Sequence, residues 1–133
     1  MARRLLDTSV LIDQWRRRKK LSQKASPSSD DVVRWARDLI RLEGTNAIVS
    51  PVVIEFLAGT QNSDELRLAK RFLAEFRAID QQEISADDWR EAERLAQRVR
   101  SPGKARDLGD CLIRAIANRL HYEVRSFDKS FIS

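Results

Sequence analysis

Short apolar runs alternate along this chain with longer stretches in which apolar residues recur every three or four positions. The short runs predict strands at residues 3–6, 47–49, 77–84 and 123–126. The longer stretches predict helices at about residues 10–18, 30–43, 51–58, 64–76, 86–99 and 107–120. Alternation of this kind restricts the fold to a parallel sheet with helices on both faces. We therefore predict a three-layer α/β/α fold with a short parallel sheet of four or five strands, and a single domain over residues 1–133.

Length and composition exclude several classes of protein. With 133 residues, of which 42% are hydrophobic and 34% charged, the chain can bury a core of its own. No apolar run approaches the roughly 18 residues of a membrane-spanning helix, and the first residues lack the pattern of a signal peptide. The single cysteine, Cys111, excludes an internal disulfide and a multi-cysteine zinc site. We expect a cytoplasmic protein.

The charge balance is basic, with a formal net charge of +5 and a sequence pI near 9.9. Such a balance favours an anionic partner, most commonly nucleic acid. A basic segment begins at the end of the first predicted helix and leads into a serine-containing loop that extends to residue 29. Its members are Arg16, Arg17, Arg18, Lys19 and Lys20. They either hold a phosphate backbone or form a solvated helix end, where cations interact favourably with the helix dipole.

Four acidic residues take positions that the predicted topology brings toward one edge of the sheet. Asp7 and Asp128 directly follow the first and last strands, and Glu55 lies one to two turns into the helix after the second strand. Ligands of open parallel sheets bind beyond the carboxyl ends of the strands, so these three acids point to the same edge. Asp110 lies in the first turn of the last long helix, and it joins them if that helix starts near this edge.

A cluster of four carboxylates needs its charge neutralised. Two like charges about 5 Å apart repel by roughly 3 kcal/mol at an effective dielectric constant near 20. A cation or raised pKa values must relieve this repulsion. Ligand sets made only of oxygen suit hard ions such as Mg²⁺ or Mn²⁺, which stabilise phosphoryl oxygens and activate a water for attack. The sequence therefore predicts a divalent metal site of the kind that nucleases use.

Each acid also has a plainer interpretation. Asp7 could cap a helix, Asp110 could interact with a helix dipole, and Asp128 could stabilise a turn. Glu55 could be a solvated helix residue, although its neighbours are apolar and an idle carboxylate is costly among them. The joint pattern favours the metal site. Asp107, three residues before Asp110, either caps the last helix or contacts the metal or its waters.

Other residues with possible chemistry have structural interpretations. His121 lies near a helix end, and Cys111 lies in an apolar helix, so both are expected to be structural rather than catalytic. Trp15 and Trp35 fit the faces of their helices, where they pack either in the core or at a dimer or partner surface.

Four segments of the chain resemble the PIN-domain family, and in particular the VapC-type toxins of toxin–antitoxin pairs. They are residues 5–12 (LLDTSVLI), 50–59 (SPVVIEFLAG), 107–117 (DLGDCLIRAIA) and 124–131 (VRSFDKSF). Each segment alone is weak, but all four in order and at family-like spacing are specific. Ser126 stands where the family usually has threonine, which keeps the hydroxyl. The basic loop after the first helix is longer than in many relatives.

The resemblance implies a metal-dependent endoribonuclease. In the family, four acids surround one or two divalent ions, and single-stranded or structured RNA, often tRNA or rRNA, is hydrolysed to leave a 3′-hydroxyl. The corresponding acids of this chain are Asp7, Glu55, Asp110 and Asp128.

The resemblance further implies a role for hydroxyl groups and for protein partners. Thr8, Ser9 or Ser126 is expected to orient an acid, a water or a phosphate. Family members act as the toxin of the pair, form homodimers, and are silenced by a cognate antitoxin that covers the site.

Two other functions remain open at this point. A receiver-like regulatory domain also carries an aspartate at a strand end beside Mg²⁺, but Glu55 and Asp110 on helices fit it poorly, and no lysine stands at the expected late strand end. A catalytically inactive, RNA-binding PIN-like domain would keep the fold, although all four acids are present.

Overall fold

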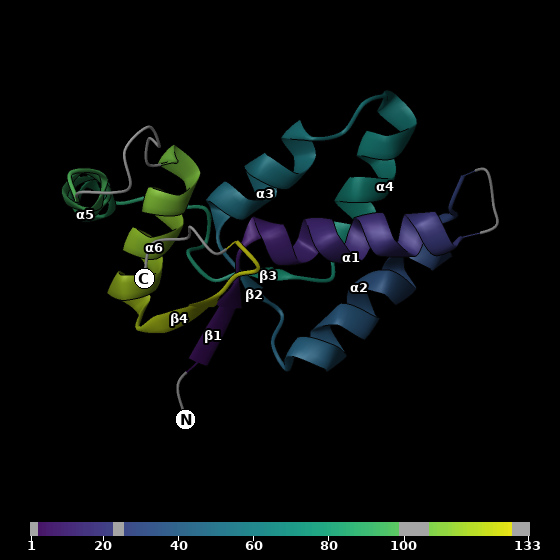
Figure 1. Ribbon diagram of the computed structural model, residues 1–133, viewed down its shortest axis with the longest axis horizontal. Helices are drawn as coiled ribbons and strands as arrows, with labels where there is room; N and C mark the ends of the chain where they lie inside the picture. The colour runs from purple at the N-terminus through teal and green to yellow at the C-terminus, as the bar shows by residue number, and fades with distance from the viewer. Residues whose placement is uncertain (1–2, 23–25, 99–106, 129–133) are drawn as a thin grey trace.

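The computed structural model describes residues 3–22, 26–98 and 107–128 of the chain. Short strands and helices alternate along it (Figure 1). The elements are β1 (Arg3–Leu6), α1 (Thr8–Leu21), α2 (Ser29–Glu43), β2 (Ala47–Ile48), α3 (Ser50–Ala58), α4 (Ser63–Leu73), β3 (Arg77–Ala78), α5 (Ala86–Ala96), α6 (Leu108–Leu120) and β4 (Tyr122–Arg125).

All strand pairs in the described part of the chain are parallel. β1 pairs with β4, with Leu5 opposite Val124, and β2 pairs with β3, with Ala47 opposite Arg77. The two pairs form separate ladders that meet where β1 packs against β2. In Figure 1, α5 and α6 lie on one side of the strands and α1, α2, α3 and α4 on the other. The predicted α/β fold with short parallel strands is therefore confirmed.

The core forms where the helices cover the strands. Leu5 of β1 and Ile113 of α6 are fully buried, in keeping with the apolar runs of the sequence. Trp15 packs edge-on against Trp35, with 5.6 Å between the ring centroids, and against Phe72, with 5.3 Å. Because both tryptophans are buried within this aromatic cluster, the alternative that placed them at a partner surface is wrong.

Several helix ends follow from local sequence signals. The Ser28 hydroxyl accepts the N–H of Asp31 at 3.1 Å and caps the start of α2. Gly44, with φ 71°, ends α2 in the left-handed conformation that glycine adopts without a steric penalty. Ser85 caps α5, because its hydroxyl accepts the N–H of Asp88.

Helix α1 is longer than predicted. It continues through Leu21, so the basic segment is helical rather than the start of a loop. Arginine and lysine have high helix propensity, and three cations in the last turn interact favourably with the helix dipole. Side-chain pairs add to this effect, because Arg17 meets Asp13 at 2.9 Å, one turn earlier on the same helix.

The third strand is much shorter than the predicted range of 77–84. β3 covers only Arg77–Ala78, and the N–H of Ile79 adds one more hydrogen bond to the carbonyl of Ile48. Gln81 and Gln82 then adopt positive φ angles of 53° and 63°, which no strand can accommodate.

Within the described ranges, no helix combines the length and the apolar character that a membrane crossing requires.

Candidate functional site

Asp7 joins the end of β1 to the start of α1. Its N–H donates to the carbonyl of Arg125 at 2.9 Å, which continues the pairing of β1 with β4. The residue occupies the N-cap position of α1, yet its side chain makes no capping hydrogen bond. The helix-capping interpretation of Asp7 is therefore wrong. Asp7 is only 3% exposed, and its carboxylate accepts a hydrogen bond from Ser126.

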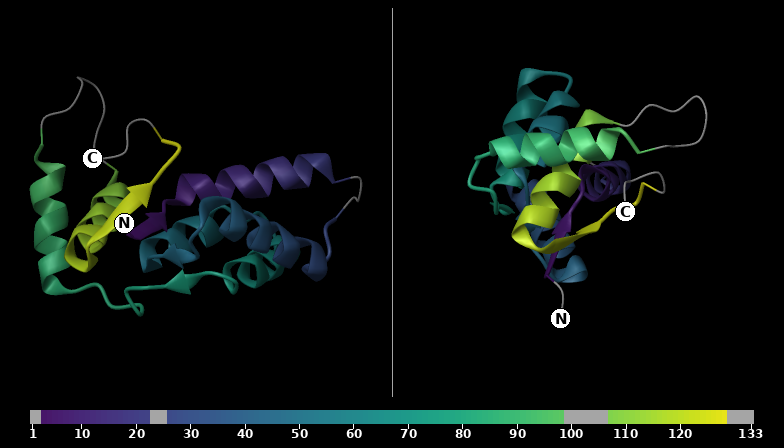
Figure 2. Two further views of the ribbon diagram at one scale, coloured as in Figure 1. Left: turned by 90° about the horizontal axis from the view of Figure 1, so that it is seen from below. Right: turned by 90° about the vertical axis from the view of Figure 1, so that its left-hand side faces the viewer.

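Two serine hydroxyls bind this carboxylate. Ser9 and Ser126 donate to Oδ2 of Asp7 at 2.9 and 2.7 Å, and their oxygens lie 3.2 Å apart. Each serine oxygen also accepts a backbone N–H at 3.0 Å, from Phe127 and Asp128 respectively. Because these amides occupy an acceptor position on each oxygen, the hydroxyl protons turn toward the carboxylate. The network joins the first helix to the segment after the last strand, where β1 and β4 lie side by side (Figure 2).

Glu55 enters the same region from α3. The buried hydroxyl of Thr8 donates to its Oε1 at 2.7 Å. Burial raises the pKa of Glu55 above its ordinary value, the hydrogen bond from Thr8 lowers it in part, and the charges of Asp107 and Asp7 raise it further. The Glu55 carboxylate therefore lies in a negative environment, not on a freely solvated helix face.

Asp110 is the centre of the acidic cluster. Burial raises the pKa of this carboxyl from 3.8 to about 7, and the negative charges of its neighbours raise it too. Those neighbours are Asp7, Asp107, Asp128 and Glu55. The four acids selected from the sequence thus converge and are not scattered over separate surfaces. We use the name acidic cluster for Asp110 together with the four neighbours just listed.

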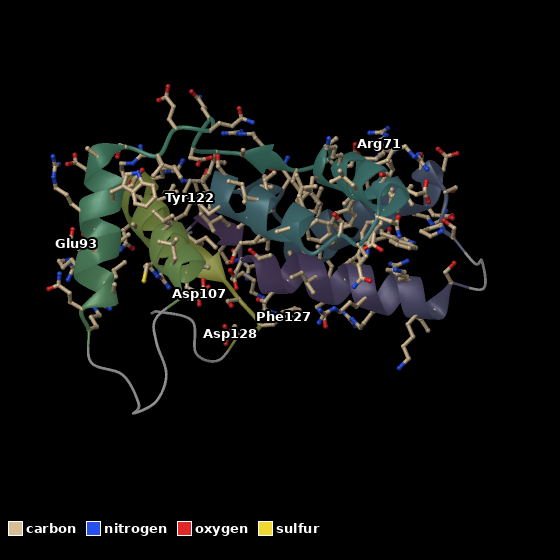
Figure 3. All side chains as sticks on the ribbon, turned by 90° about the horizontal axis from the view of Figure 1, so that it is seen from above. Arg71, Glu93, Asp107, Tyr122, Phe127 and Asp128 are labelled. Carbon is tan, nitrogen blue, oxygen red and sulfur yellow. The ribbon has the colours of Figure 1, made fainter. Side chains whose placement is uncertain are left out.

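The outer members of the cluster lie at the N-terminal end of α6. Asp107 caps this helix, since its Oδ1 accepts the N–H of Asp110 at 3.2 Å, which confirms the capping interpretation. Asp128 is exposed and follows β4. Figure 3 shows Asp107 and Asp128 on the same side of the molecule, near the start of α6.

Gly109 is a site residue that sequence reasoning missed. A Cβ atom at this position would lie 2.5 Å from Oε2 and 2.7 Å from Cδ of Glu55. No other residue type allows the Glu55 carboxylate to approach α6 so closely. The sequence did carry a signal: glycine costs about 1 kcal/mol relative to alanine inside a helix, and this one lies two residues after Asp107 and directly before Asp110. What it makes room for could not be read from the sequence.

The cluster fits a divalent cation by its chemistry. Its donors are all carboxylate oxygens, and among the described residues no lysine or arginine pairs with Asp7, Glu55 or Asp110. Burial, and to a lesser extent the neighbouring negative charges, raise the pKa values of Glu55 and Asp110, and a hard cation would relieve the repulsion between these carboxylates. Within the described ranges, no three of these side chains stand close enough to form a complete metal-binding group.

The predicted basic residues lie away from this cluster. At about 1.5 Å per residue, Arg16 is some 12 Å along α1 from Thr8. Arg16 and Lys19 line a separate groove of about 440 Å³ between α1 and the segment after α3. Arg18 pairs with Asp38 at 2.7 Å and Lys19 with Glu65 at 3.3 Å, whereas Arg16 and Lys20 are exposed. His121 is the C-cap residue of α6, with φ 62°, and Cys111 is buried.

Comparison with protein families identifies one match. The family model of the PIN domain matches residues 4–133, a range that contains every member of the acidic cluster. A comparison with curated proteins finds no match.

Proposed function

Since the chain belongs to the PIN-domain family, we propose that it is a divalent-metal-dependent endoribonuclease. PIN domains are generally nucleases, so a phosphodiester is the substrate class. The observation that carries the proposal is the convergence of Asp7, Glu55, Asp107 and Asp128 on the carboxyl of Asp110. A carboxyl with a pKa of about 7 among four other carboxylates suits a cation site far better than a structural role.

In this proposal the acids bind the metal ion and the hydroxyl groups orient the acids. Asp7, Asp110 and Asp128 would hold Mg²⁺ or Mn²⁺, with Glu55 completing the set directly or through a water. Such an ion supplies positive charge that stabilises phosphoryl oxygens and makes an attacking water more acidic. The hydroxyls of Ser9 and Ser126 hold the Asp7 carboxylate in one orientation. Thr8 does the same for Glu55, which limits the reorganisation that binding requires.

RNA is the proposed substrate because the rest of the molecule is basic. The net charge is +5 in spite of the acidic cluster, so long-range attraction favours a polyanion. Arg16 and Lys20 are exposed on α1, and we propose that they contact phosphate groups of the RNA. Arg17, Arg18 and Lys19 already have carboxylate partners, so they contribute less.

The four motifs that resemble VapC-type toxins support a more specific role. We place the chain as the toxin of a toxin–antitoxin pair, a cytoplasmic homodimer that acts on tRNA or rRNA and is silenced by a cognate antitoxin. The family match favours this function over a receiver-like regulatory domain. A neighbouring small reading frame that encodes an antitoxin is the observation expected for this role.

Cleavage of labelled RNA tests the proposed function. With Mn²⁺ or Mg²⁺ present, the purified protein is expected to cut RNA internally and to leave 3′-hydroxyl ends. Chelation of the ion by EDTA is expected to stop the reaction, and added Mn²⁺ to restore it. Cleavage that persists in EDTA would contradict the proposal. Calorimetry that detects RNA binding but neither metal binding nor cleavage would identify an inactive RNA-binding domain instead, and phosphate transfer from acetyl phosphate would identify a receiver.

Substitution of Gly109 tests the placement of Glu55. Gly109→Ala is expected to displace the Glu55 carboxylate, whose Oε2 lies 2.5 Å from the new Cβ, and to lower kcat by about 10- to 100-fold. The fold is expected to survive, because the displaced atoms are the end of a flexible side chain and alanine favours the helix. Steady-state kinetics and circular dichroism measure the two effects.

Gly59 offers a matched control for this substitution. A Cβ at Gly59 would meet only the carbonyl oxygen of Phe56, at an ordinary contact distance of 3.6 Å. Gly59→Ala is therefore expected to leave kcat unchanged. Equal activity of the Gly109→Ala and wild-type proteins would show that the position of the Glu55 carboxylate does not limit the reaction.

A further inference from the structure

Phe127 is a large apolar side chain on the surface beside the acidic cluster. It stands between Ser126, which donates a hydrogen bond to Asp7, and Asp128, whose negative charge raises the pKa of Asp110. The residue is 41% exposed. Its backbone N–H donates to the hydroxyl of Ser9 at 3.0 Å, so the same network that orients Asp7 also fixes this backbone. Figure 3 shows Phe127 next to Asp128 on this side of the molecule.

The ring of Phe127 also makes a cation–π contact with the guanidinium of Arg125. The guanidinium carbon of Arg125 lies 4.8 Å from the ring centroid. Nε of Arg125 in turn donates to Oε1 of Glu43 at 3.0 Å, and Glu43 is only 7% exposed. Because a buried carboxylate anchors the guanidinium, the cation is held against the ring and does not sample many rotamers. Glu43, Arg125 and Phe127 thus form a preorganised stack that ends at the surface.

We propose that Phe127 is a stacking platform for one nucleobase of single-stranded RNA, next to the phosphate that the acidic cluster receives. The inference rests on the proposed function and deepens it by naming the residue that receives a base of the substrate. Phe127 and Asp128 are consecutive residues whose Cα atoms are about 3.8 Å apart, so we expect a base next to a phosphate bound at Asp128 to reach the ring.

Single-stranded RNA follows from the geometry of stacking. A base can lie on an aromatic ring only when it has left its own stack, which loops and single strands allow and a duplex does not. Every base has a π-face, so the platform tolerates all four bases. The guanidinium behind the ring adds positive charge, which favours a nucleotide over an apolar peptide side chain at this place.

Abasic substitutions in the RNA test the platform. A set of labelled single-stranded RNAs, each lacking one base near the cleaved bond, is compared with the intact RNA. For the wild-type protein, one abasic position is expected to lower kcat/KM by about 5- to 100-fold. For Phe127→Ala, the intact RNA is expected to show a similar loss, with no further loss at that abasic position. Phe127→Tyr and Phe127→Trp are expected to restore both the rate and the sensitivity.

Leu42 provides the control for loss of an exposed apolar side chain. It is 70% exposed on α2, outside the cluster, so Leu42→Ala is expected to leave the abasic profile unchanged. Matching thermal unfolding of all variants shows that the fold is intact. A duplex of the same sequence is expected to be cut poorly by every variant.

Distinct outcomes separate this inference from the proposed function. If the wild-type protein cuts RNA but Phe127→Ala retains full activity and full abasic sensitivity, the platform is refuted and a protein ligand becomes the candidate occupant of the ring. Additive losses from the substitution and the abasic position refute it as well. If no RNA is cut, the proposed function fails, and fluorescence anisotropy with the same RNAs still measures whether the base and the ring act together in binding.

Discussion

Asp7→Asn is expected to lower the rate of RNA cleavage by at least about 1000-fold while the protein remains folded. The substitution removes one negative charge from the acidic cluster but keeps the size of the side chain. The asparagine oxygen can still accept the hydrogen bonds that Ser9 and Ser126 donate to Asp7. A loss of about 4 kcal/mol in stabilisation of the transition state corresponds to this change in rate.

Asp80 provides a matched control for this substitution. It is also a buried carboxylate, 5% exposed, but it accepts the N–H of Ser50 and does not belong to the cluster. Asp80→Asn is expected to change stability more than cleavage, since it removes a buried charge away from the site. RNA-end sequencing after brief expression of each variant measures cleavage, and circular dichroism measures folding. A folded Asp7→Asn protein with wild-type activity would remove the basis of the assignment.

Divalent binding is expected to weaken by up to about tenfold for each pH unit below about 7. The pKa of Asp110 is raised to about 7, so below this pH the carboxyl of the metal-free protein carries a proton that binding must displace. Above pH 7 the carboxylate is already ionised, and the affinity is expected to level off. Calorimetric titration with Mn²⁺ from about pH 5.5 to about pH 8.5 measures the change, and buffers of different ionisation enthalpy count the released proton.

The same pKa makes the metal-free protein less stable as the pH rises. Between the unfolded pKa of 3.8 and the folded value of about 7, the folded state holds a proton that the unfolded state has lost, so the free energy of unfolding falls across this window. Asp110→Asn removes the effect. At about pH 8 it is expected to raise stability on the order of 1–2 kcal/mol, after discounting for the solvent screening of a half-buried group.

Thermal unfolding in EDTA and in Mn²⁺ separates the two effects of Asp110. The wild-type protein is expected to gain stability from Mn²⁺ at about pH 8, and the Asp110→Asn protein to gain much less. Asp64, an exposed acid paired with Arg67 on α4, serves as control. Asp64→Asn is expected to leave the response to Mn²⁺ unchanged. An affinity that does not vary with pH would show that Asp110 does not have to lose a proton on binding.

Local signals explain why much of the fold was predictable. Ser85 and Gly44 act through hydrogen bonds and backbone angles within a few residues, so their effects are visible in the sequence. The length of β3 could not be predicted in this way, because the turn at Gln81 ends the strand although apolar residues continue after it in the sequence. The end of α1 was misjudged for a related reason: carboxylates on other elements, such as Asp38 and Glu65, stabilise the basic segment as a helix.

The acidic residues themselves were visible in the sequence, since an acid directly after a strand must lie at the sheet edge whatever the details of packing. Their chemistry was decided only by tertiary structure. The hydroxyl of Ser126 reaches Asp7 across 119 positions of the chain, and Gly109 makes room for Glu55 from another helix. Hydrogen bonding and backbone preference act over a few residues, whereas burial and the distances between charges depend on how α3, α6 and β4 pack together. That packing sets the pKa of Asp110.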